Sequence, residues 1–536
     1  MSLGVDDSLP PRWASTLLGE ACLINPRGHV RAPHDDTLVS FVPMAAVEAG
    51  TGRVDVGQTK RYKDVRQGYT RFSDGDVLFA KITPCMENGK IAVVTGLRNG
   101  LGAGSTEFHV LRPIAGISEK LVMYYVSMDE FRRAARQVMT GTAGQLRVPQ
   151  RFVEGAPFPL APLPEQYRIV AEIEKQLTRL DAAIAALNRA RAKLKRYRAS
   201  VLKAACEGRL VPTEAELARR EGRSYESASV LLDRVLKERR SRWEAEQRER
   251  NHGRGGRLDE GEPKRSRRIL GEPAGKLMTL PEGWVGTSLL TIAELKGGVT
   301  KGQKHKPGVR LREVPYLRVA NVQRGYLDLR EVKTIKARVE DVRDLALRPG
   351  DVLFNEGGDR DKLGRGWVWS GEISECIHQN HVFRARLCGA DIQPKFVSWY
   401  GNSFGQAYFI GEGKQTTNLA SINMTKLAAL PIPLPPTREQ ERIVDEVEHR
   451  LSLLDALELA VESNLKRSER LRQAILKHAF EGKLAPQDPT DESASVLLDR
   501  IKAERASLEG DSDRCKPARR RPAGRKGKAV GREVRT

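Results

Sequence analysis

Several short stretches carry residues that could do chemistry, but none completes a catalytic pattern. GGVTKGQK (297–304) begins like a phosphate-binding loop, yet Gln303 follows Gly302 where that motif requires Lys. LGAGST (101–106) is glycine-rich in a way that indicates only a turn. REVKTIK (330–336) has the Glu-x-Lys of a metal-dependent nuclease without an acidic partner upstream, and no Asn-Pro-Pro-Tyr motif of adenine methyltransferases occurs. The sequence therefore predicts no catalytic residue and no cofactor bound by this chain.

Candidate metal ligands are equally scattered. His378 and His381 are close in sequence, but no cysteine or carboxylate pair frames them, which is more typical of structural histidines. The six cysteines include no CxxC pair, so neither a zinc site nor a disulfide framework is indicated. The N-terminus does not resemble a signal peptide, and no apolar run reaches the roughly 18 residues of a spanning helix. We expect a cytoplasmic protein without a metal site.

Charge is the strongest compositional feature. The chain has 536 residues, a formal net charge of +22 and a pI near 9.8. Such an excess of Lys and Arg favours a polyanionic partner, most often nucleic acid. The alternative is a soluble surface with a basic tail, since RCKPARRRPAGRKGKAVGREVRT (514–536) could either bind DNA non-specifically or only solubilise the chain.

An internal duplication organises the chain. Residues 158–212 align with 432–486 without a gap, with 24 identities in 55 positions. The match includes PEQYRIVAEIE (164–174) against REQERIVDEVE (438–448), and it ends in CEGRLVP against FEGKLAP. ESASVLLDR (226–234) also returns at 492–500. The sequence thus predicts two copies of one structural unit.

Each copy has the pattern of a long helix that begins near the proline run and ends at Gly208 or Gly482. Apolar residues alternate at spacings of four and three, which predicts a coiled-coil seam interrupted at Arg191 and Arg198. The predicted seam comprises Ile173, Leu177, Leu180, Ile184 and Leu187 in the first copy, and Val447, Leu451, Leu454, Val461 and Leu465 in the second. Later positions in phase are Leu194, Val201 and Ile475.

We expect the two helices, each about 40 residues and roughly 60 Å long, to pair antiparallel. Ordinary core packing within one globule is the alternative. Pairing would place a globular domain at the N-terminus of each helix, so that one chain imitates a symmetric dimer. Dimers of DNA-binding units read two half-sites at a fixed separation.

The segments before the helices also match, more faintly. LPPRW (9–13) corresponds to LPEGW (280–284), and DGDVLF (74–79) to PGDVLF (349–354). Apolar runs separated by Gly and Pro indicate mixed α/β structure. The predicted fold is therefore two globular α/β domains separated by two long helices that form an antiparallel coiled coil, with an internal pseudo-twofold repeat.

The duplicated proline–EQ–helix unit, the KAACEGRL and KHAFEGKL helix ends and the paired GDVLF segments resemble the specificity (S) subunits of Type I restriction–modification systems. The resemblance covers about residues 9–505. It implies a non-catalytic subunit whose two target-recognition domains bind a bipartite, asymmetric sequence in double-stranded DNA. It also implies two modification (methyltransferase) subunits as partners, which methylate adenine N6, and restriction subunits in a larger complex. S-adenosylmethionine, ATP and Mg would be bound by those partners.

With this resemblance, the chain divides into alternating domains and helical regions. The predicted domains are target-recognition domain 1 (1–157), helical region 1 (158–212), a short helix and charged linker (213–275), target-recognition domain 2 (276–431), helical region 2 (432–486), and a short helix with a basic tail (487–536). The SASVLLDR segments are expected either to pack on the long helices or to hold a partner subunit.

Two polar loops follow the GDVLF segments and fit the task of reading bases. The first, FAKITPCMENGK (79–90), carries Lys81, Thr83, Asn88 and Lys90; the second, FNEGGDRDKLGRG (354–366), carries Asn355, Arg360, Lys362 and Arg365. Solvated surface loops are the alternative interpretation. Thr140, Gly141, Thr142, Lys414, Gln415, Thr416 and Thr417 are further candidates. As a hypothesis, Arg360→Ala or Lys90→Ala should weaken target binding.

Two other functions stay open from the sequence alone. One is a stand-alone coiled-coil DNA-binding regulator without enzyme partners. The other is an autonomous nuclease or methylase, which the motifs support poorly.

Overall fold

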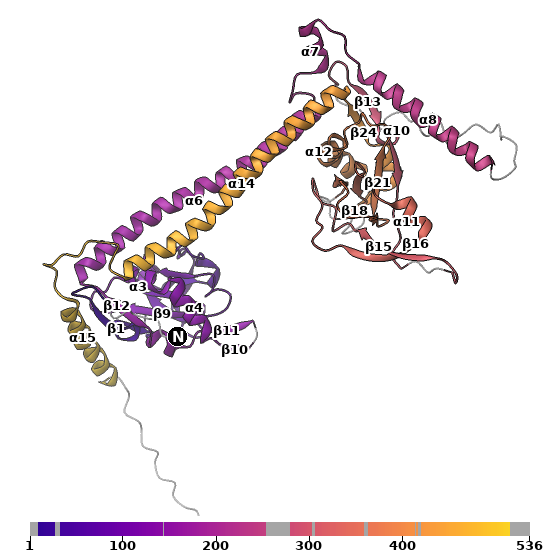
Figure 1. Ribbon diagram of the computed structural model, residues 1–536. Helices are drawn as coiled ribbons and strands as arrows, with labels where there is room; N and C mark the ends of the chain where they lie inside the picture. Colours follow the sequence, from indigo (N-terminus) through magenta and orange to yellow (C-terminus); the bar gives the residue numbers. More distant parts are fainter. Residues whose placement is uncertain are drawn as a thin grey trace, which may run out of the picture. The chain divides into compact units, whose positions relative to one another are not determined.

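The computed structural model describes residues 9–26, 33–142, 144–252, 279–302, 306–358, 363–412, 414–415 and 420–514 (Figure 1). The chain forms two compact units. Unit 1 is drawn from residues 1–187 and 463–536, and unit 2 from residues 188–462. Among the described residues, no helix is long and apolar enough to cross a membrane.

The globular part of unit 1 contains two four-stranded sheets, in the strand orders β2-β9-β6-β7 and β4-β3-β8-β5, and two small strand pairs, β1-β12 and β10-β11. Phe79, Phe131 and Phe158 are fully buried in its core. The strands are β1 (Ala14–Leu17), β2 (Cys22–Ile24), β3 (Leu38–Val42), β4 (Thr59–Arg61), β5 (Thr70–Ser73), β6 (Val77–Ala80), β7 (Ile91–Val93), β8 (Leu101–Gly104), β9 (Phe108–Pro113), β10 (Thr140–Thr142), β11 (Gln145–Arg147) and β12 (Pro157–Leu160). The helices are α1 (Leu18–Ala21), α2 (Tyr62–Val65), α3 (Glu119–Val126), α4 (Asp129–Gln137) and α5 (Gln150–Glu154).

Unit 2 repeats this plan. Its sheets have the orders β14-β21-β17-β19 and β16-β15-β20, with the smaller groups β13-β24 and β18-β23-β22. The strands are β13 (Val285–Ser288), β14 (Ala293–Lys296), β15 (Leu311–Leu317), β16 (Lys333–Arg338), β17 (Val352–Asn355), β18 (Gly357–Gly358), β19 (Gly366–Val368), β20 (Ile377–His378), β21 (Val382–Leu387), β22 (Lys414–Gln415), β23 (Ala420–Ser421) and β24 (Pro431–Leu434). The helices are α10 (Leu289–Ile292), α11 (Val339–Leu345), α12 (Pro394–Glu412) and α13 (Met424–Ala428). The predicted α/β class of both globular domains is confirmed.

The repeated GDVLF segments form the central strands β6 and β17, and their aspartates make the same buried clamp. Arg112 on β9 donates from Nε and Nη2 to the two oxygens of Asp76, at 2.7 Å each. Arg386 on β21 donates to Asp351 in the same way, at 2.8 and 2.7 Å. Both aspartates are almost completely buried. Each clamp therefore joins two neighbouring strands of a sheet through a bidentate, charge-assisted contact.

The two long helices are α6 (Leu163–Cys206) and α14 (Thr437–Phe480), which lie side by side (Figure 1). Each begins at the duplicated Glu-Gln pair, whose glutamine is fully buried. Gln166 Nε2 donates to Ala161 O at 2.9 Å, and Gln166 Oε1 accepts from the backbone N–H of Ser118 at 3.1 Å. Gln440 makes the equivalent bonds in unit 2, to Pro435 O at 2.8 Å and from the N–H of Gln393 at 2.9 Å. Each glutamine thus ties the helix to its own globular domain.

The adjacent glutamates make a second repeated contact. The indole N–H of Trp13 donates to Glu165 at 3.0 Å, and that of Trp284 donates to Glu439 at 2.8 Å. Burial raises the pKa of both carboxyl groups above its ordinary value. The duplicated LPPRW and LPEGW segments are therefore held against the start of the helix that follows in the same unit.

The two helices run antiparallel with the same register in both units. In unit 1, Arg472 of α14 donates to Asp181 of α6. In unit 2, Arg198 of α6 donates to Asp455 of α14 and lies 3.3 Å from Glu458. Asp455 follows Asp181 by the repeat offset of 274 residues, and Arg472 follows Arg198 by the same offset. One ion pair of the duplicated sequence is thus made twice, and the predicted antiparallel coiled coil is confirmed.

The predicted seam lies on the facing sides of these helices. Six of the ten predicted seam residues are buried: Ile173, Leu177, Leu180, Val447, Leu454 and Val461. The other four are half-buried: Ile184, Leu187, Leu451 and Leu465. Arg198, which interrupts the sequence pattern, is half-buried and paired with the two carboxylates of α14. A cation within the seam is therefore accommodated by ion pairing rather than by apolar packing.

Both helices end at a glycine that the globular domain approaches closely. Gly208 and Gly482 each have φ +67°, and a Cβ there would lie 2.5 Å from Pro281 and 2.3 Å from Pro10, respectively. Only glycine adopts this positive φ without strain and has no Cβ to clash with the neighbouring proline. After α6 come α7 (Glu214–Glu221) and α8 (Ala228–His252), and after α14 comes α15 (Ala494–Arg514).

The SASVLLDR segments begin α8 and α15, and they pack on globular domains. Ala228, Leu231 and Val235 are buried in the core of unit 2, and Ala494, Leu497 and Ile501 are buried in the core of unit 1. The N–H of Ala228 bonds to Gly283 O, and that of Ala494 bonds to Arg12 O, both at 2.9 Å. The sequence left open whether these segments pack on the long helices or hold a partner subunit. In the structure, the apolar face of each segment continues a globular core.

Replacing Asp76 by Asn should destabilise unit 1 by about 3 kcal/mol, since one member of a buried ion pair would remain without its charged partner. Hydrogen exchange of peptides covering β6 and β9 should accelerate, while peptides from β17 and β21 keep their wild-type rates. Asp64→Asn, at an exposed position of α2, is the matched control. Equal exchange in Asp76→Asn and the control would refute the importance of the clamp.

Candidate nucleic-acid interface

In unit 1, the predicted base-reading loop lies against the small hairpin formed by β10 and β11. Thr83 N donates to Leu146 O at 3.0 Å, and Thr83 Oγ1 donates to Gly144 O at 3.2 Å. The N–H of Leu146 donates back to Thr83 Oγ1 at 3.1 Å. The structure thus brings together two candidate DNA-contacting segments that are about 60 residues apart in sequence.

The four predicted residues of this loop have different environments. Lys81 is half-buried, and desolvation lowers the pKa of its ammonium group below the ordinary value. Thr83 is occupied by the hairpin contacts, and Lys90 Nζ donates to Met44 O at 2.9 Å. Asn88 is exposed at the loop surface. The geometry therefore favours Asn88 and Lys81 as groups that can reach a ligand, with Thr83 and Lys90 shaping the loop.

The hairpin itself presents polar residues to solvent. Thr140, Gly141 and Thr142 of β10 are all exposed. Arg147 of β11 binds Glu107 through Nε at 2.9 Å and Nη2 at 2.7 Å. The sequence analysis did not identify Arg147 and Glu107 as candidate site residues, because they are 40 residues apart and no local pattern indicates their pairing. Both lie close to Lys81 and influence its pKa.

Unit 2 has the corresponding arrangement. The loop after β17 contains β18, which pairs antiparallel with β23, and β23 in turn pairs with β22. Lys414 and Gln415 form β22, so the second pair of candidate segments is also adjacent in space. Equivalent loops of the two copies therefore meet equivalent hairpins.

Two of the four predicted residues of the second loop, Asn355 and Arg365, are described, and both donate hydrogen bonds to backbone carbonyl groups. Asn355 is completely buried and donates from Nδ2 to Val319 O at 3.2 Å and to Val322 O at 2.8 Å. Arg365 is half-buried and donates to Val319 O at 3.2 Å. Arg360, Lys362, Thr416 and Thr417 lie outside the described residues. Base reading by this loop stays a prediction. The contacts of Asn355 show that its side chain stabilises the surrounding backbone.

The two closely spaced histidines are in unlike environments. His378 is completely buried, its Nδ1 lies 2.6 Å from Val382 O, and desolvation lowers its pKa to about 4. His381 is exposed and lies 2.5 Å from Glu356. Within the described part of the chain, no group of three or more His, Cys, Asp or Glu side chains has the geometry to hold a metal ion.

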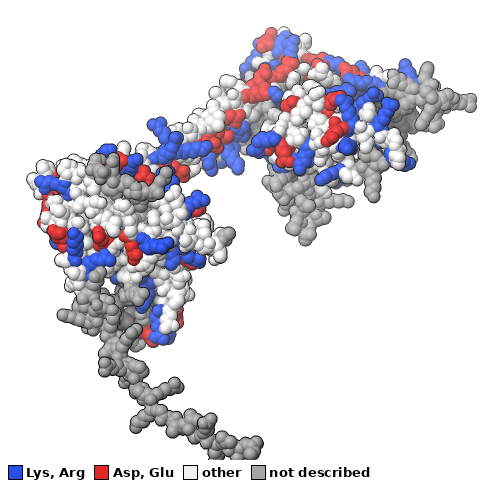
Figure 2. Space-filling model, turned by 60° about the horizontal axis from the view of Figure 1, so that its bottom comes forward, with Lys and Arg blue, Asp and Glu red and all other residues white. Residues whose placement is uncertain are grey.

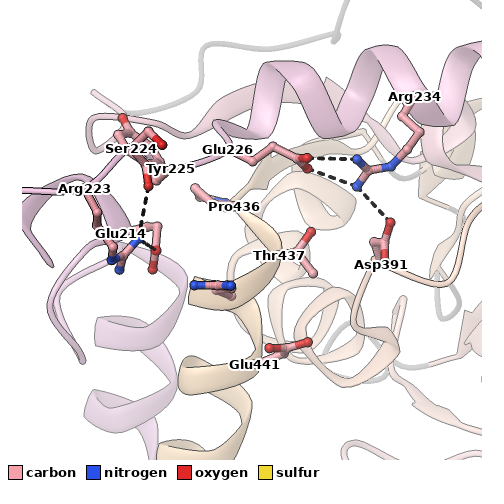
Figure 3. Close-up of a pocket in the computed structure, with 11 residues that line it drawn as sticks. Glu214, Arg223, Ser224, Tyr225, Glu226, Arg234, Asp391, Pro436, Thr437 and Glu441 are labelled. Carbon is pink, nitrogen blue, oxygen red and sulfur yellow. Dashed lines mark hydrogen bonds and ion pairs between the residues drawn. The ribbon is translucent and has the colours of Figure 1, made fainter. Parts of the chain in front are cut away.

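A charged pocket of about 510 Å³ lies in unit 2 beside the start of α14 (Figure 3). Five of its lining residues come from the segment between the helix-ending glycine and SASV. This segment includes α7 and is eight residues longer after α6 than after α14. Arg234 bridges Glu226 at 2.9 Å and Asp391 at 2.8 Å across one side. Glu214 lies 2.6 Å from both Arg223 and Arg442 on the other.

The electrostatics of this pocket are those of a structural junction. Burial alone would raise the pKa of Glu214, but the two arginines outweigh burial and hold it below its ordinary value. A carboxylate held ionised by two cations cannot serve as a proton donor near neutral pH. The Glu214 N–H also donates to Glu439 at 2.8 Å, so the pocket fixes the segment after α6 to the start of α14.

Known proteins share this arrangement along most of the chain, although no family model matches it. The EcoEI specificity subunit of Escherichia coli, from a Type I restriction enzyme, is 26% identical over 520 residues, covering 88% of this chain and 83% of its own length. The EcoAI specificity subunit of the same organism is 27% identical over 519 residues with the same coverage. This chain is thus similar, over most of its length, to specificity subunits of Type I restriction enzymes.

The solved structures agree at the level of the fold. A chain in a structure of a Type I restriction–modification system covers 89% of this chain and 100% of its own length, with a TM-score of 0.60 and 21% identity. This similarity supports the arrangement of two α/β domains and two long helices. An identity of 21% is too low to assign roles to individual residues of this chain from that structure. The roles of the loop residues are therefore argued from their own contacts.

Asn88→Ala should weaken binding of the target by roughly 1–3 kcal/mol and relax one position of one half-site, if Asn88 reads a base. Asp64→Asn, at an exposed position of α2 outside the predicted loops, is the matched control. Binding should be measured on duplexes that differ in one half-site at a time. Unchanged affinity and unchanged sequence preference in Asn88→Ala would exclude this residue as a reader.

Proposed function

We propose that this chain is the DNA sequence-specificity subunit of a Type I restriction–modification complex. Its two globular domains would each bind one half of a bipartite, asymmetric target in double-stranded DNA. The chain itself would perform no reaction and would position partner subunits that methylate adenine N6 or cleave DNA.

The observation that carries the proposal is the repetition of one interface with different residues. In both units, the loop after the clamped strand lies against a hairpin that precedes the long helix. The clamp, the glutamine anchor and the helix register are repeated almost unchanged, whereas the loops differ as ITPCMENGK and EGGDRDKLGRG. Scaffold contacts that stay constant beside loops that diverge are expected when two domains read different sequences.

The proposed partners are two modification subunits, with restriction subunits in the larger complex. The names of the relatives associate them with Type I restriction enzymes, and the similar solved chain comes from such an assembly. We propose that S-adenosylmethionine, ATP and Mg are bound by those partners and that this chain binds no cofactor. Such a complex would act in the cytoplasm, where the bacterial chromosome lies.

A stand-alone DNA-binding regulator is the alternative function, and the relatives do not support it. The EcoEI and EcoAI proteins are both named as specificity subunits of restriction enzymes rather than as independent regulators.

The central experiment is a genome-wide map of N6-methyladenine in cells with and without the gene. Deletion should abolish methylation of one bipartite, asymmetric motif, and the lost motif would reveal the target. A complementing wild-type copy should restore it, which is the control for effects on neighbouring genes. A map that is unchanged by deletion, in cells that express the modification subunit, would contradict the proposal.

We further propose that the paired helices set the spacing between half-sites. Inserting one heptad into each helix, after residues 189 and 463, preserves the register because both helices grow at matching positions. Seven residues add about 10 Å of helix, which corresponds to roughly three base pairs of B-DNA.

The methylated motif of the heptad variant should therefore keep both half-sites and gain a longer spacer. Insertion in α6 alone is the control, and it should abolish methylation because the register of the ion pairs is lost. Methylation of the original motif with its original spacer by the double insertion would rule out this role.

A further inference from the structure

One part of α6 is more basic than its function as a spacer requires. Residues 182–206 contain seven Lys or Arg and no Asp or Glu. The equivalent residues of the second copy, 456–480, contain five Lys or Arg and three glutamates. Because the two stretches have the same structural task, the excess charge of the first needs a separate explanation.

The helical period gathers part of this charge on one face of α6 in unit 2. Arg189, Lys193 and Arg196 are spaced by four and three residues, and Lys203 follows two turns later, so they share one side of the helix. All four are exposed, whereas Leu194 is half-buried and Val201 is buried on the opposite side, toward α14. We call these four residues the basic face. It extends over roughly 20 Å.

The charge of the basic face is not neutralised within the described structure. Neither Arg189 nor Lys193 has a carboxylate partner among the described residues, and Lys203 lies 3.9 Å from Glu207, at the limit of an ion pair. The carboxylates of Asp455 and Glu458 instead bind Arg198, which lies on the side toward α14. Figure 2 shows blue Lys and Arg side chains on the exposed surface of the paired helices, with red Asp and Glu side chains also present along them.

The residues between these cations distinguish a nucleic acid from a protein partner. Ala192, Ala199 and Ser200 lie on the same face and are small and exposed, which allows a ligand to approach the helix closely. Protein interfaces are enriched in aromatic, Met and Arg side chains around an apolar core. Of the large exposed apolar residues of this part, Leu453, Leu457 and Leu459 belong to α14. The exposed Tyr197 of α6 lies to one side of the basic face, about 100° around the helix from Arg196. Cations among small residues fit phosphate groups better.

We propose that the basic face of α6 binds the phosphate backbone of duplex DNA without reading its bases. This inference rests on the proposed function, since it adds a third DNA contact to the two recognition domains. Each Lys or Arg that neutralises a phosphate releases condensed counterions, so the contact would strengthen binding of any sequence and make it sensitive to salt. The target sequence would still be chosen by the recognition domains.

The test replaces Arg189, Lys193 and Arg196 together by Gln in the complete complex with its modification subunits. The probes are a duplex with the methylated motif and a random-sequence duplex of equal length, titrated at several salt concentrations. The slope of log K against log salt should become shallower by up to about 2.7, which is 0.9 for each lost phosphate contact. Affinity should fall for both duplexes by a similar factor, and the methylated motif should be unchanged.

The matched control is Lys237→Gln, Arg240→Gln and Arg242→Gln on α8, which removes the same charge from exposed positions of the same unit. This variant should keep the wild-type slope. An equal change in both variants would show a general charge effect and would overturn the proposal.

Three other outcomes also decide the question. A wild-type slope in the triple variant of α6 would overturn the basic face as a DNA contact. Loss of the modification subunits from the triple variant, with DNA binding otherwise intact, would identify an acidic protein partner instead. If the wild-type complex binds neither duplex, the proposed function fails first, and the inference fails with it.

Discussion

The buried glutamine at the start of each long helix is the contact on which the rest of the architecture depends. Gln166 and Gln440 each bond to the strand end that precedes the helix and to a backbone N–H of the adjacent domain. A buried amide whose bonds are satisfied by backbone groups tolerates little displacement, because a lost partner leaves a desolvated polar group. Each globular domain is thereby held at a fixed orientation to the helix that follows it.

A second set of contacts connects the segment after one long helix to the start of the other long helix. Arg168 of α6 binds Asp491 at 2.5 Å, and its repeat equivalent Arg442 of α14 binds Glu214 at 2.6 Å. The helices α15 and α8 then complete the cores of units 1 and 2. Each unit therefore contains one globular domain, the beginning of one long helix and the end of the other. The similarity of the duplicated helical halves agrees with this exchange, since equivalent residues make equivalent contacts in the two units.

The candidate DNA-contacting surfaces obey different physical constraints from the scaffold. Scaffold residues such as Asp76 and Asp351 are buried and bonded, so their replacement costs stability. Asn88 and the basic face of α6 are exposed, so their replacement is expected to affect binding while the fold is preserved. Diverging loops and an unequal distribution of helix charge are compatible with a constant framework because the repeated aspartate clamps and glutamine anchors involve neither of them.

The sequence by itself determined the duplication, the two long helices, the seam and the absence of a recognisable catalytic motif, because these follow from periodicity and from short local patterns. It also located both loops beside the GDVLF strands. Only the tertiary structure decided that Thr83 and Asn355 bond to backbone groups, that SASVLLDR continues a globular core, and that Arg147 pairs with Glu107. Each of these contacts joins segments that are distant in sequence, and local spacing carries no information about which polar side chain will find its partner in the folded chain.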